Sequence, residues 1–278
     1  HREITAARQF QHSWKATHII VPESVRFSGR FACVAGSKCL YLCASQFDIP
    51  MKRFITSLIL IATCCISFAQ HDMTPVDWKE IKKQVKKDPQ RVNELVAALA
   101  TPEMYGSLSL EDCILGFYGQ SILVKNAGRD KSDEASRLYN QGEYEKALAA
   151  AGEALEKNPL NIRALEKSAY CIIALMEAGD TAYTDSDIEL YVMREIKLLS
   201  TIAKTGDGSE EYPFCVTNVD DEYDFMRTYL RLSRFGGQAL VGRCDVITIA
   251  EQSEYYKADK IYFDATRPLE IMEELFRF

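Results

Sequence analysis

The densest group of side chains capable of chemistry is the acidic run at residues 220–224, which contains Asp221 and Glu222. Two further aspartates, Asp245 and Asp264, fall at or near the ends of predicted strands. Carboxylates that converge across a small sheet can bind a hard cation such as calcium, or can serve as an acid and base pair. The alternative is structural: Asp221 caps a helix, Glu222 favours its positive end, and the other aspartates terminate strands.

Histidine is almost absent from the main body of the chain. The four histidines are His1, His12, His18 and His71, so none follows residue 71. Catalytic triads, cysteine–histidine pairs, histidine-ligated zinc and histidine general bases are therefore excluded there. We expect a protein that is not an enzyme and that carries no cofactor.

Residues 51–69 have the three parts of a secretion signal. A basic start is followed by an apolar stretch that is short for a bilayer span, and then by a small-residue exit that ends at Ala69. We expect cleavage after Ala69 and export, in the first place to the periplasm. Residues 1–50 then result from translation upstream of the true start.

Two other interpretations of this leader stay open. Residues 1–50 can be a genuine domain followed by one membrane anchor, although they contain no Met and show no sustained periodicity. Alternatively, the protein is a lipoprotein anchored at Cys64. The preceding residues match a lipobox only in part, because Thr63 stands where Gly, Ala or Ser is usual.

Charge argues against nucleic acid as a partner. The whole chain has a net charge of −7, and residues 70–278 hold 25 basic and 37 acidic side chains, a net charge of −12. A chain with this negative net charge repels nucleic acid and anionic lipid. We also expect no transmembrane segment in the mature chain.

Four cysteines follow the leader, namely Cys113, Cys171, Cys215 and Cys244, and none forms a CxxC pair. Two bridges with three connectivities are possible outside the cytoplasm. However, Cys171 lies in an apolar helical run, and Cys215 and Cys244 lie in predicted strands. These settings favour unpaired core thiols, with a Cys215 to Cys244 bridge as the one pairing to check.

Residues 74–205 are predicted to be a series of helices with marked starts. Capping residues followed by proline, and pairs with capping-box spacing, indicate these starts. The starts are Thr74-Pro75, Asp88-Pro89, Ser109 with Asp112, and Thr184 with Asp187.

Residues 131–161 resemble a tetratricopeptide repeat. Small residues at the helix crossing, a turn glycine, an aromatic and a closing proline fall at the expected places. They are Ala135, Gly142, Tyr144, Ala147, Ala154 and Pro159. Small residues let antiparallel helices approach closely, and proline stops the second helix. A second, partial repeat covers residues 162–179.

This resemblance implies that the first helix of each pair lines a concave binding surface. It nominates Ser136, Tyr139, Asn140, Arg163, Glu166 and Tyr170 as contacts for a protein or peptide partner. The alternative is that neighbouring helices bury this surface.

The C-terminal third changes pattern after a turn-rich segment at residues 205–209. Strands are predicted at 212–219, 238–250 and 260–264, and helices at 222–234 and 268–276. We therefore predict an α+β fold with two regions. A helical, tetratricopeptide-like array at 70–205 packs on a small β-sheet unit with flanking helices at 206–278.

Several short motifs carry a second resemblance. They are Thr205-Gly206-Asp207-Gly208, Asp221-Glu222-Tyr223, Cys244-Asp245-Val246 and Tyr262-Phe263-Asp264. With the leader and the helical array, they resemble a family of secreted Bacteroidota proteins described as a domain of unknown function (DUF 4919-like). The resemblance implies location and architecture, and it brings no activity or catalytic residue.

These observations together predict an exported, noncatalytic protein-interaction module of the cell envelope. The alternative is a metal-dependent binder or an acid-dependent hydrolase that uses Asp221, Glu222, Asp245 and Asp264.

Overall fold

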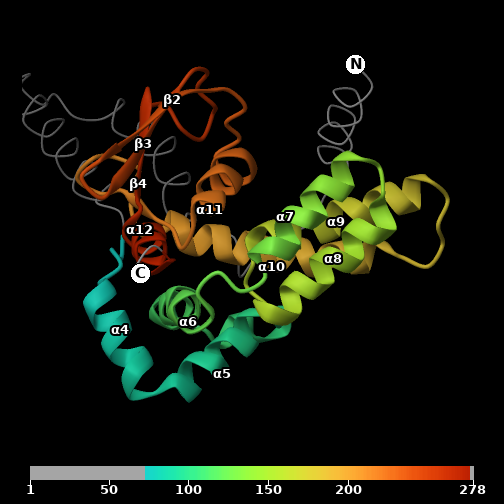
Figure 1. Cartoon of the computed structure of the whole chain (residues 1–278), viewed down its shortest axis with the longest axis horizontal. Coiled ribbons are helices and arrows are strands. Elements are labelled where there is room, and N and C mark those ends of the chain that lie inside the picture. The colour runs from blue at the N-terminus through green and yellow to red at the C-terminus, as the bar shows by residue number, and fades with distance from the viewer. Residues whose placement is uncertain (1–72, 276–278) are drawn as a thin grey trace, which may run out of the picture. The chain divides into compact units, whose positions relative to one another are not determined.

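The computed structural model describes residues 73–275 (Figure 1). These residues belong to one compact unit. The predicted signal at 51–69, its cleavage point and the alternative lipid site at Cys64 lie outside the described residues. Within 73–275, no helix has both the length and the apolar character needed to cross a membrane.

The N-terminal part of this unit consists of helices joined by short connections. In chain order they are α4 (Trp78–Lys87), α5 (Pro89–Leu99), the 3₁₀ turn η2 (Pro102–Ser107), α6 (Leu110–Val124), α7 (Arg129–Asn140), α8 (Tyr144–Lys157), α9 (Ile162–Glu177) and α10 (Asp185–Ala203). A small sheet and further helices follow, so the predicted α+β class is confirmed.

Three of the four predicted helix starts are confirmed, at Asp88, Ser109 and Thr184. The start at Thr74-Pro75 is wrong, because α4 begins at Trp78 with Asp77 as its N-cap. The Asp77 carboxylate accepts hydrogen bonds from the Lys79 and Glu80 amides, at 2.9 and 3.1 Å. It directly precedes the apolar stripe of α4, so it satisfies the free amides of the first turn where packing begins.

Helices α7, α8 and α9 lie side by side (Figure 1). Their contact surface is built from alanines that are fully buried, including Ala135, Ala147 and Ala154. Gly142 makes the turn between α7 and α8 with φ +79°. Small side chains allow the close helix approach that the alanine spacing predicts.

The C-terminal part holds a four-stranded sheet with the order β1-β4-β3-β2. The strands are β1 (Phe214–Cys215), β2 (Phe235–Val241), β3 (Cys244–Ile249) and β4 (Lys260–Asp264). β2, β3 and β4 pair antiparallel, whereas β1 runs parallel to β4. Helix α12 (Thr266–Leu275) closes the chain.

The strand at 260–264 is confirmed, but two other predicted boundaries are wrong. Residues 212–219 form only the two-residue strand β1. The segment at 238–250 is a hairpin of β2 and β3 and not one strand, because Gly242 takes a positive φ of 64° and reverses the chain.

The helix predicted at 222–234 begins earlier and ends earlier. It is α11 (Val219–Asp224), which continues into one π-helical turn, η3 (Phe225–Tyr229). Asn218 caps it, and its side chain accepts from the Asp221 amide at 3.1 Å. The predicted end at Arg234 is wrong, because Arg231 takes a positive φ of 56°, which a right-handed helix does not allow.

One hydrophobic core joins the helices to the sheet. Trp78, Tyr118, Leu199, Phe225 and Phe263 all belong to it. The Tyr118 hydroxyl donates to the Cys215 carbonyl at 2.8 Å, which ties α6 to β1. All four described cysteines are free, three of them buried and Cys244 half-buried.

Candidate functional site

The acidic run folds as the first turn of α11, where Asp221 has a structural role. Its Oδ2 accepts from the Thr217 hydroxyl at 2.6 Å and from the Thr217 and Asn218 amides, each at 3.2 Å. Burial raises the pKa of Asp221 to about 6, and these hydrogen bonds oppose that rise. Asp221 therefore completes the capping box of Asn218, although the sequence predicted Asp221 as the cap itself.

Glu222 and Asp245 form a buried carboxyl pair between α11 and β3. Glu222 is 0% exposed and Asp245 is 8% exposed. Within the described part of the chain, neither Glu222 oxygen meets a hydrogen-bond donor. Burial first, and the neighbouring Asp245 second, raise the pKa of Glu222 to about 9. Two buried carboxyl groups in contact cannot both carry a charge, so the pair holds a proton at neutral pH.

A short polar chain connects this carboxyl pair to the surface. The Gln238 amide nitrogen donates to Asp245 Oδ2 at 2.5 Å, and the Tyr223 hydroxyl donates to Gln238 Oε1 at 2.5 Å. Gln238 lies on β2 and is exposed. The proton that Glu222 holds is thus buried, and one amide separates Asp245 from solvent.

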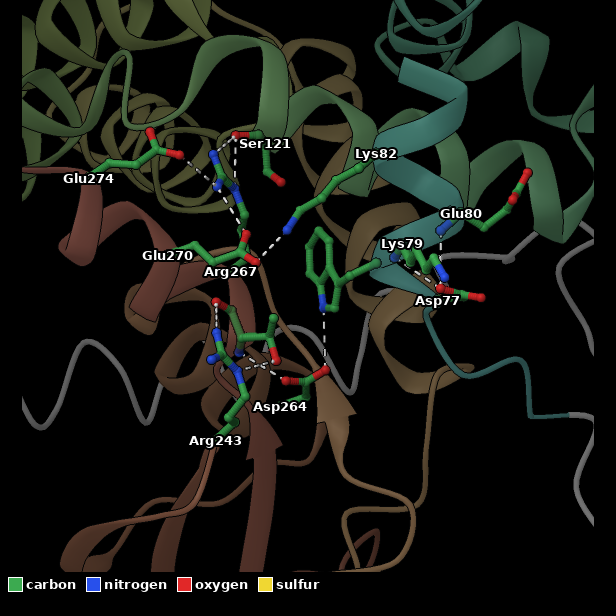
Figure 2. Close-up of polar contacts among 12 residues, drawn as sticks. Asp77, Lys79, Glu80, Lys82, Ser121, Arg243, Asp264, Arg267, Glu270 and Glu274 are labelled. Atoms are coloured by element: carbon green, nitrogen blue, oxygen red, sulfur yellow. Dashed lines mark hydrogen bonds and ion pairs between the residues drawn. The ribbon is translucent and has the colours of Figure 1, made fainter. Parts of the chain in front are cut away.

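Asp264 contacts other residues, which Figure 2 shows. Its Oδ2 accepts from the Trp78 indole N–H at 3.3 Å, and its Oδ1 accepts from the Thr266 amide at 2.9 Å. Asp245 pairs with Phe263 and Asp264 pairs with Cys244, so alternation places the two aspartates on opposite faces of the sheet. Of the four predicted carboxylates, the structure brings together only Glu222 and Asp245.

The described residues contain no group of three or more His, Cys, Asp or Glu side chains placed to hold a metal ion. Calcium takes six or more oxygen ligands. The two carboxyl groups of Glu222 and Asp245 hold at most four oxygens between them, which is too few.

Arg163 on α9 is turned toward α11. Its guanidinium lies 2.8 Å from Asp220 Oδ1 and 3.3 Å from Asp224 Oδ1. Asp220 also lies 3.4 Å from Arg129 Nε at the start of α7. The side chain of Arg163 is only 18% exposed, and these ion pairs join three helices.

A second group of buried carboxyl side chains includes Asp224, the ion-pair partner of Arg163. Glu166, Glu195 and Asp224 come from α9, α10 and α11, and each is buried. Burial raises the pKa of Asp224 to about 7, with a further rise from Glu166 that Arg163 opposes. Burial, followed by Glu166 and Asp224, raises the pKa of Glu195 well above its usual range. Lys167 Nζ lies 2.7 Å from Glu166 Oε2 and balances one of these charges.

The remaining predicted contact residues lie around Lys167. Its Nζ is 5.5 Å from the ring centroid of Tyr139 and 5.3 Å from that of Tyr170, within cation–π range. The two rings are 6.1 Å apart and half-buried. The Ser136 hydroxyl donates to the Ser132 carbonyl within α7. Asn140 is exposed at the end of the same helix.

Comparison with known families gives one match over this region. The family described as Domain of unknown function (DUF4919) matches residues 116–274. The chain belongs to this family. The match runs from α6 to α12, so it includes both groups of buried carboxyl side chains. No curated protein and no solved structure matches the chain.

Three residues of this DUF4919 site were missed by the sequence analysis, namely Lys167, Glu195 and Gln238. The sequence holds a signal for Glu195, because it lies on the apolar stripe of α10 between Val192 and Leu199. A carboxylate at a position of apolar periodicity indicates a buried acid. No comparable signal identifies Gln238, since its role depends on the register of β2 against β3.

The DUF4919 domain also has a small polar depression beside the Arg163 ion pairs. Lys125, Arg129, Asn158, Asn161 and Asn218 contribute to its lining. Its three cations, Lys125, Arg129 and Arg163, already contact carboxylates. Lys125 lies 2.8 Å from Glu274, Arg129 lies 3.4 Å from Asp220, and Arg163 has the ion pairs given above. These ion pairs connect the loop after α6 to α12, and the start of α7 to α11.

Proposed function

We propose that this DUF4919 protein is an exported, noncatalytic interaction module of the cell envelope. In this proposal α7, α8 and α9 form a tetratricopeptide-like array that binds a protein or peptide partner. The observation that carries the proposal is the cluster of Tyr139, Lys167 and Tyr170 beside the exposed Asn140. It lies on the first helices of two successive helix pairs, where such arrays bind their partners.

The chemistry of this cluster suits a polypeptide ligand. Tyrosine offers a large contact area at small entropic cost, together with a polar hydroxyl. Lys167 lies against both rings and is paired with Glu166 at 2.7 Å, so it holds the two tyrosines in place for contact with the partner. Arg163 and Glu166 then stabilise the array and do not bind the partner directly. Their charged groups are already paired, Arg163 with Asp224 and Glu166 with Lys167.

Burial of the acid pair supports a noncatalytic role. Glu222 is 0% exposed, so a substrate reaches it only if α11 or the hairpin moves.

The alternative function, an acid-dependent hydrolase, is supported by one observation. The raised pKa of Glu222, about 9, keeps a carboxylic acid protonated at neutral pH, as a general acid requires.

Photo-crosslinking tests the partner site. A photoreactive amino acid is placed at Asn140 on α7, and as a control at the exposed Lys86 on α4. The proposal expects a crosslinked partner at position 140 and none at position 86, with loss of the adduct in a folded Tyr139→Ala variant. Equal capture at both positions, or capture unaffected by Tyr139→Ala, would contradict it.

Export is tested separately on protein recovered from the source cells. Residues 51–69 support a signal peptide, so the proposal expects the mature chain to begin at Gln70 in the periplasmic fraction. An intact mass that includes a lipid at Cys64 would support the lipoprotein alternative. Recovery of the chain in the cytoplasm with residues 51–69 attached would contradict export.

A further inference from the structure

β2 is an edge strand with one side open to solvent. In the sheet order β1-β4-β3-β2 it is the last strand, and among residues 73–275 it pairs with β3 alone. Every residue from Gly236 to Val241 is exposed. An open edge offers a row of backbone donors and acceptors to any extended chain that approaches it.

The hairpin turn determines which backbone groups point outward. Gly242 and Arg243 form a two-residue turn, closed by the pair Val241 and Cys244. The residues that close such a turn exchange hydrogen bonds with each other, and hydrogen-bonded and non-bonded pairs then alternate along the strands. Gln238 and Leu240 therefore direct their N–H and C=O groups away from β3. No other described element forms a backbone hydrogen bond with either residue.

The open edge is also apolar at the end of β2 that lies next to the hairpin turn. Leu240 is 56% exposed and Val241 is 55% exposed. They are consecutive in the strand, so they lie on opposite faces of the sheet. An added strand would cover part of both side chains. The irregularity at Gly236 and Gly237 disturbs only the start of β2, and the register from Gln238 to Val241 is regular.

Arginines border the strand at both ends. Arg234 directly precedes β2, Arg243 lies in the turn after it, and the Arg227 guanidinium lies 5.9 Å from the Phe235 ring centroid. In the described part of the chain, neither Arg227 nor Arg243 has a carboxylate within ion-pair distance; Arg243 donates to Thr266 oxygens. Arg234 is 75% exposed, and its nearest carboxylate oxygen, of Glu251, is 3.8 Å away. In a chain of net charge −7, the charges of Arg227 and Arg243 are thus not neutralised by any described carboxylate, and Arg234 has one long, exposed ion pair.

We propose that the open edge of β2 binds an extended acidic segment of a partner protein, which adds to the sheet as a fifth strand. Backbone hydrogen bonds to Gln238 and Leu240 supply the docking, and the flanking arginines select carboxylates. This surface lies on the hairpin and is independent of the α7–α9 surface, so either can fail without the other.

A second copy of the chain is a poorer occupant of the same edge. Antiparallel pairing of two β2 strands would place Arg234 of one copy beside Arg243 of the other. Like charges opposite one another destabilise strand pairs. The charge pattern therefore favours an acidic partner over self-association.

The test uses the folded full chain and a fluorescent seven-residue peptide in which Val alternates with Glu. A peptide with Lys in place of Glu is the matched probe. Fluorescence anisotropy is expected to show binding of the acidic peptide about tenfold or more tighter than the basic one, weakening with salt. Hydrogen exchange is expected to slow at residues 238–241 when the acidic peptide is present.

Two sets of variants connect binding to the edge. Leu240→Pro removes an outward N–H that β3 does not use, so β2 stays paired and binding should be lost. Leu240→Thr keeps that N–H and should still bind. Arg234→Glu with Arg243→Glu should weaken the acidic peptide about tenfold or more and favour the basic one. This pair lies on the surface, so it tests the proposal even if Leu240→Pro fails to fold.

Three results would overturn the proposal. One is absence of binding by the acidic peptide to the folded chain. Another is binding that Leu240→Pro and the double arginine variant both leave unchanged. The third is concentration-dependent self-association that the double arginine variant abolishes, which would assign the edge to a second copy.

Discussion

The carboxyl group of Glu222 on α11 contacts that of Asp245 on β3, and both are buried. Asp245 in turn accepts a hydrogen bond from Gln238 on β2. The acidic segment and the hairpin are therefore joined through this carboxyl contact, in which Glu222 holds a proton. Because the pair must keep that proton to stay buried, its contribution to stability depends on pH.

Replacing Glu222 with Gln should stabilise the protein at alkaline pH. The folded chain keeps this proton up to a pKa of about 9, whereas the unfolded chain releases it near the usual value of 4.5. The stability that protonation provides is present below pH 4.5 and is lost as the pH rises through about 9, at about 1.4 kcal/mol per pH unit. Gln keeps the neutral shape and donates to Asp245 at every pH. We expect Glu222→Gln to unfold at higher denaturant concentration than the parent at pH 8, and to differ little at pH 5.

The exposed Glu254→Gln variant is the control for this pH dependence. It removes one carboxylate without touching the buried pair, so its unfolding midpoint should follow that of the parent at both pH values. Equal effects of the two substitutions, or a Glu222→Gln variant that is less stable at pH 8, would show that the pair does not hold a proton.

Removing Arg163 should destabilise the junction of α9 with α11. Asp224 would lose its charged partner at 3.3 Å while remaining buried, and Asp220 would lose one at 2.8 Å. Loss of one partner of a buried ion pair costs about 3 kcal/mol. Chemical denaturation of Arg163→Ala should show this loss, and adding Asp224→Asn should recover part of it.

The exposed pair of Lys146 and Glu143 on α8 provides the comparison for Arg163. Lys146→Ala should leave the denaturation midpoint nearly unchanged, because solvent screens exposed ion pairs. If Arg163→Ala is as mild as Lys146→Ala, the ion pairs with α11 contribute nothing to stability.

Two glycines of the helical array should respond differently to alanine. Both have positive φ, 85° at Gly128 and 79° at Gly142. A Cβ on Gly142 meets nothing within 4 Å, whereas one on Gly128 would lie 2.6 Å from the Ala154 carbonyl oxygen. Thermal unfolding should show a loss of about 1–2 kcal/mol for Gly142→Ala, because alanine is strained at positive φ, and a clearly larger loss for Gly128→Ala. Equal losses would mean that α7 can move away from α8 at no cost.

Local chemistry explains the parts of the fold that the sequence could predict. The capping signals at Asp88, Ser109 and Thr184 act within one turn of the chain, and so does the turn at Gly142. The hairpin was missed because residues 238–250 are β-prone almost throughout, and only Gly242 marks the reversal. Propensity alone does not place a turn inside such a run.

The candidate site could be predicted only in part, because its contacts are long-range. The acidic residues were found by composition, yet pairing of Glu222 with Asp245 requires the position of α11 against β3. Alternation in β4 gives the orientation of Asp264, but only once its register with β3 is known. Arg163 was selected as a partner contact, and its ion pairs with Asp220 and Asp224 depend on packing that sequence spacing does not encode.

Thiol accessibility provides a test of the packing around the sheet. Cys113, Cys171 and Cys215 are each no more than 3% exposed, whereas Cys244 at the start of β3 is half-buried. Burial raises the pKa of all four thiols, which slows alkylation because the thiolate is the reactive form. In the native protein, iodoacetamide at pH 8 should modify Cys244 slowly and before the other three, as mapped by peptide mass. Denaturant should make all four react at similar rates. Rapid labelling of Cys215 under native conditions would contradict the packing of β1 against α6, and a peptide linking Cys215 to Cys244 would contradict the free thiols.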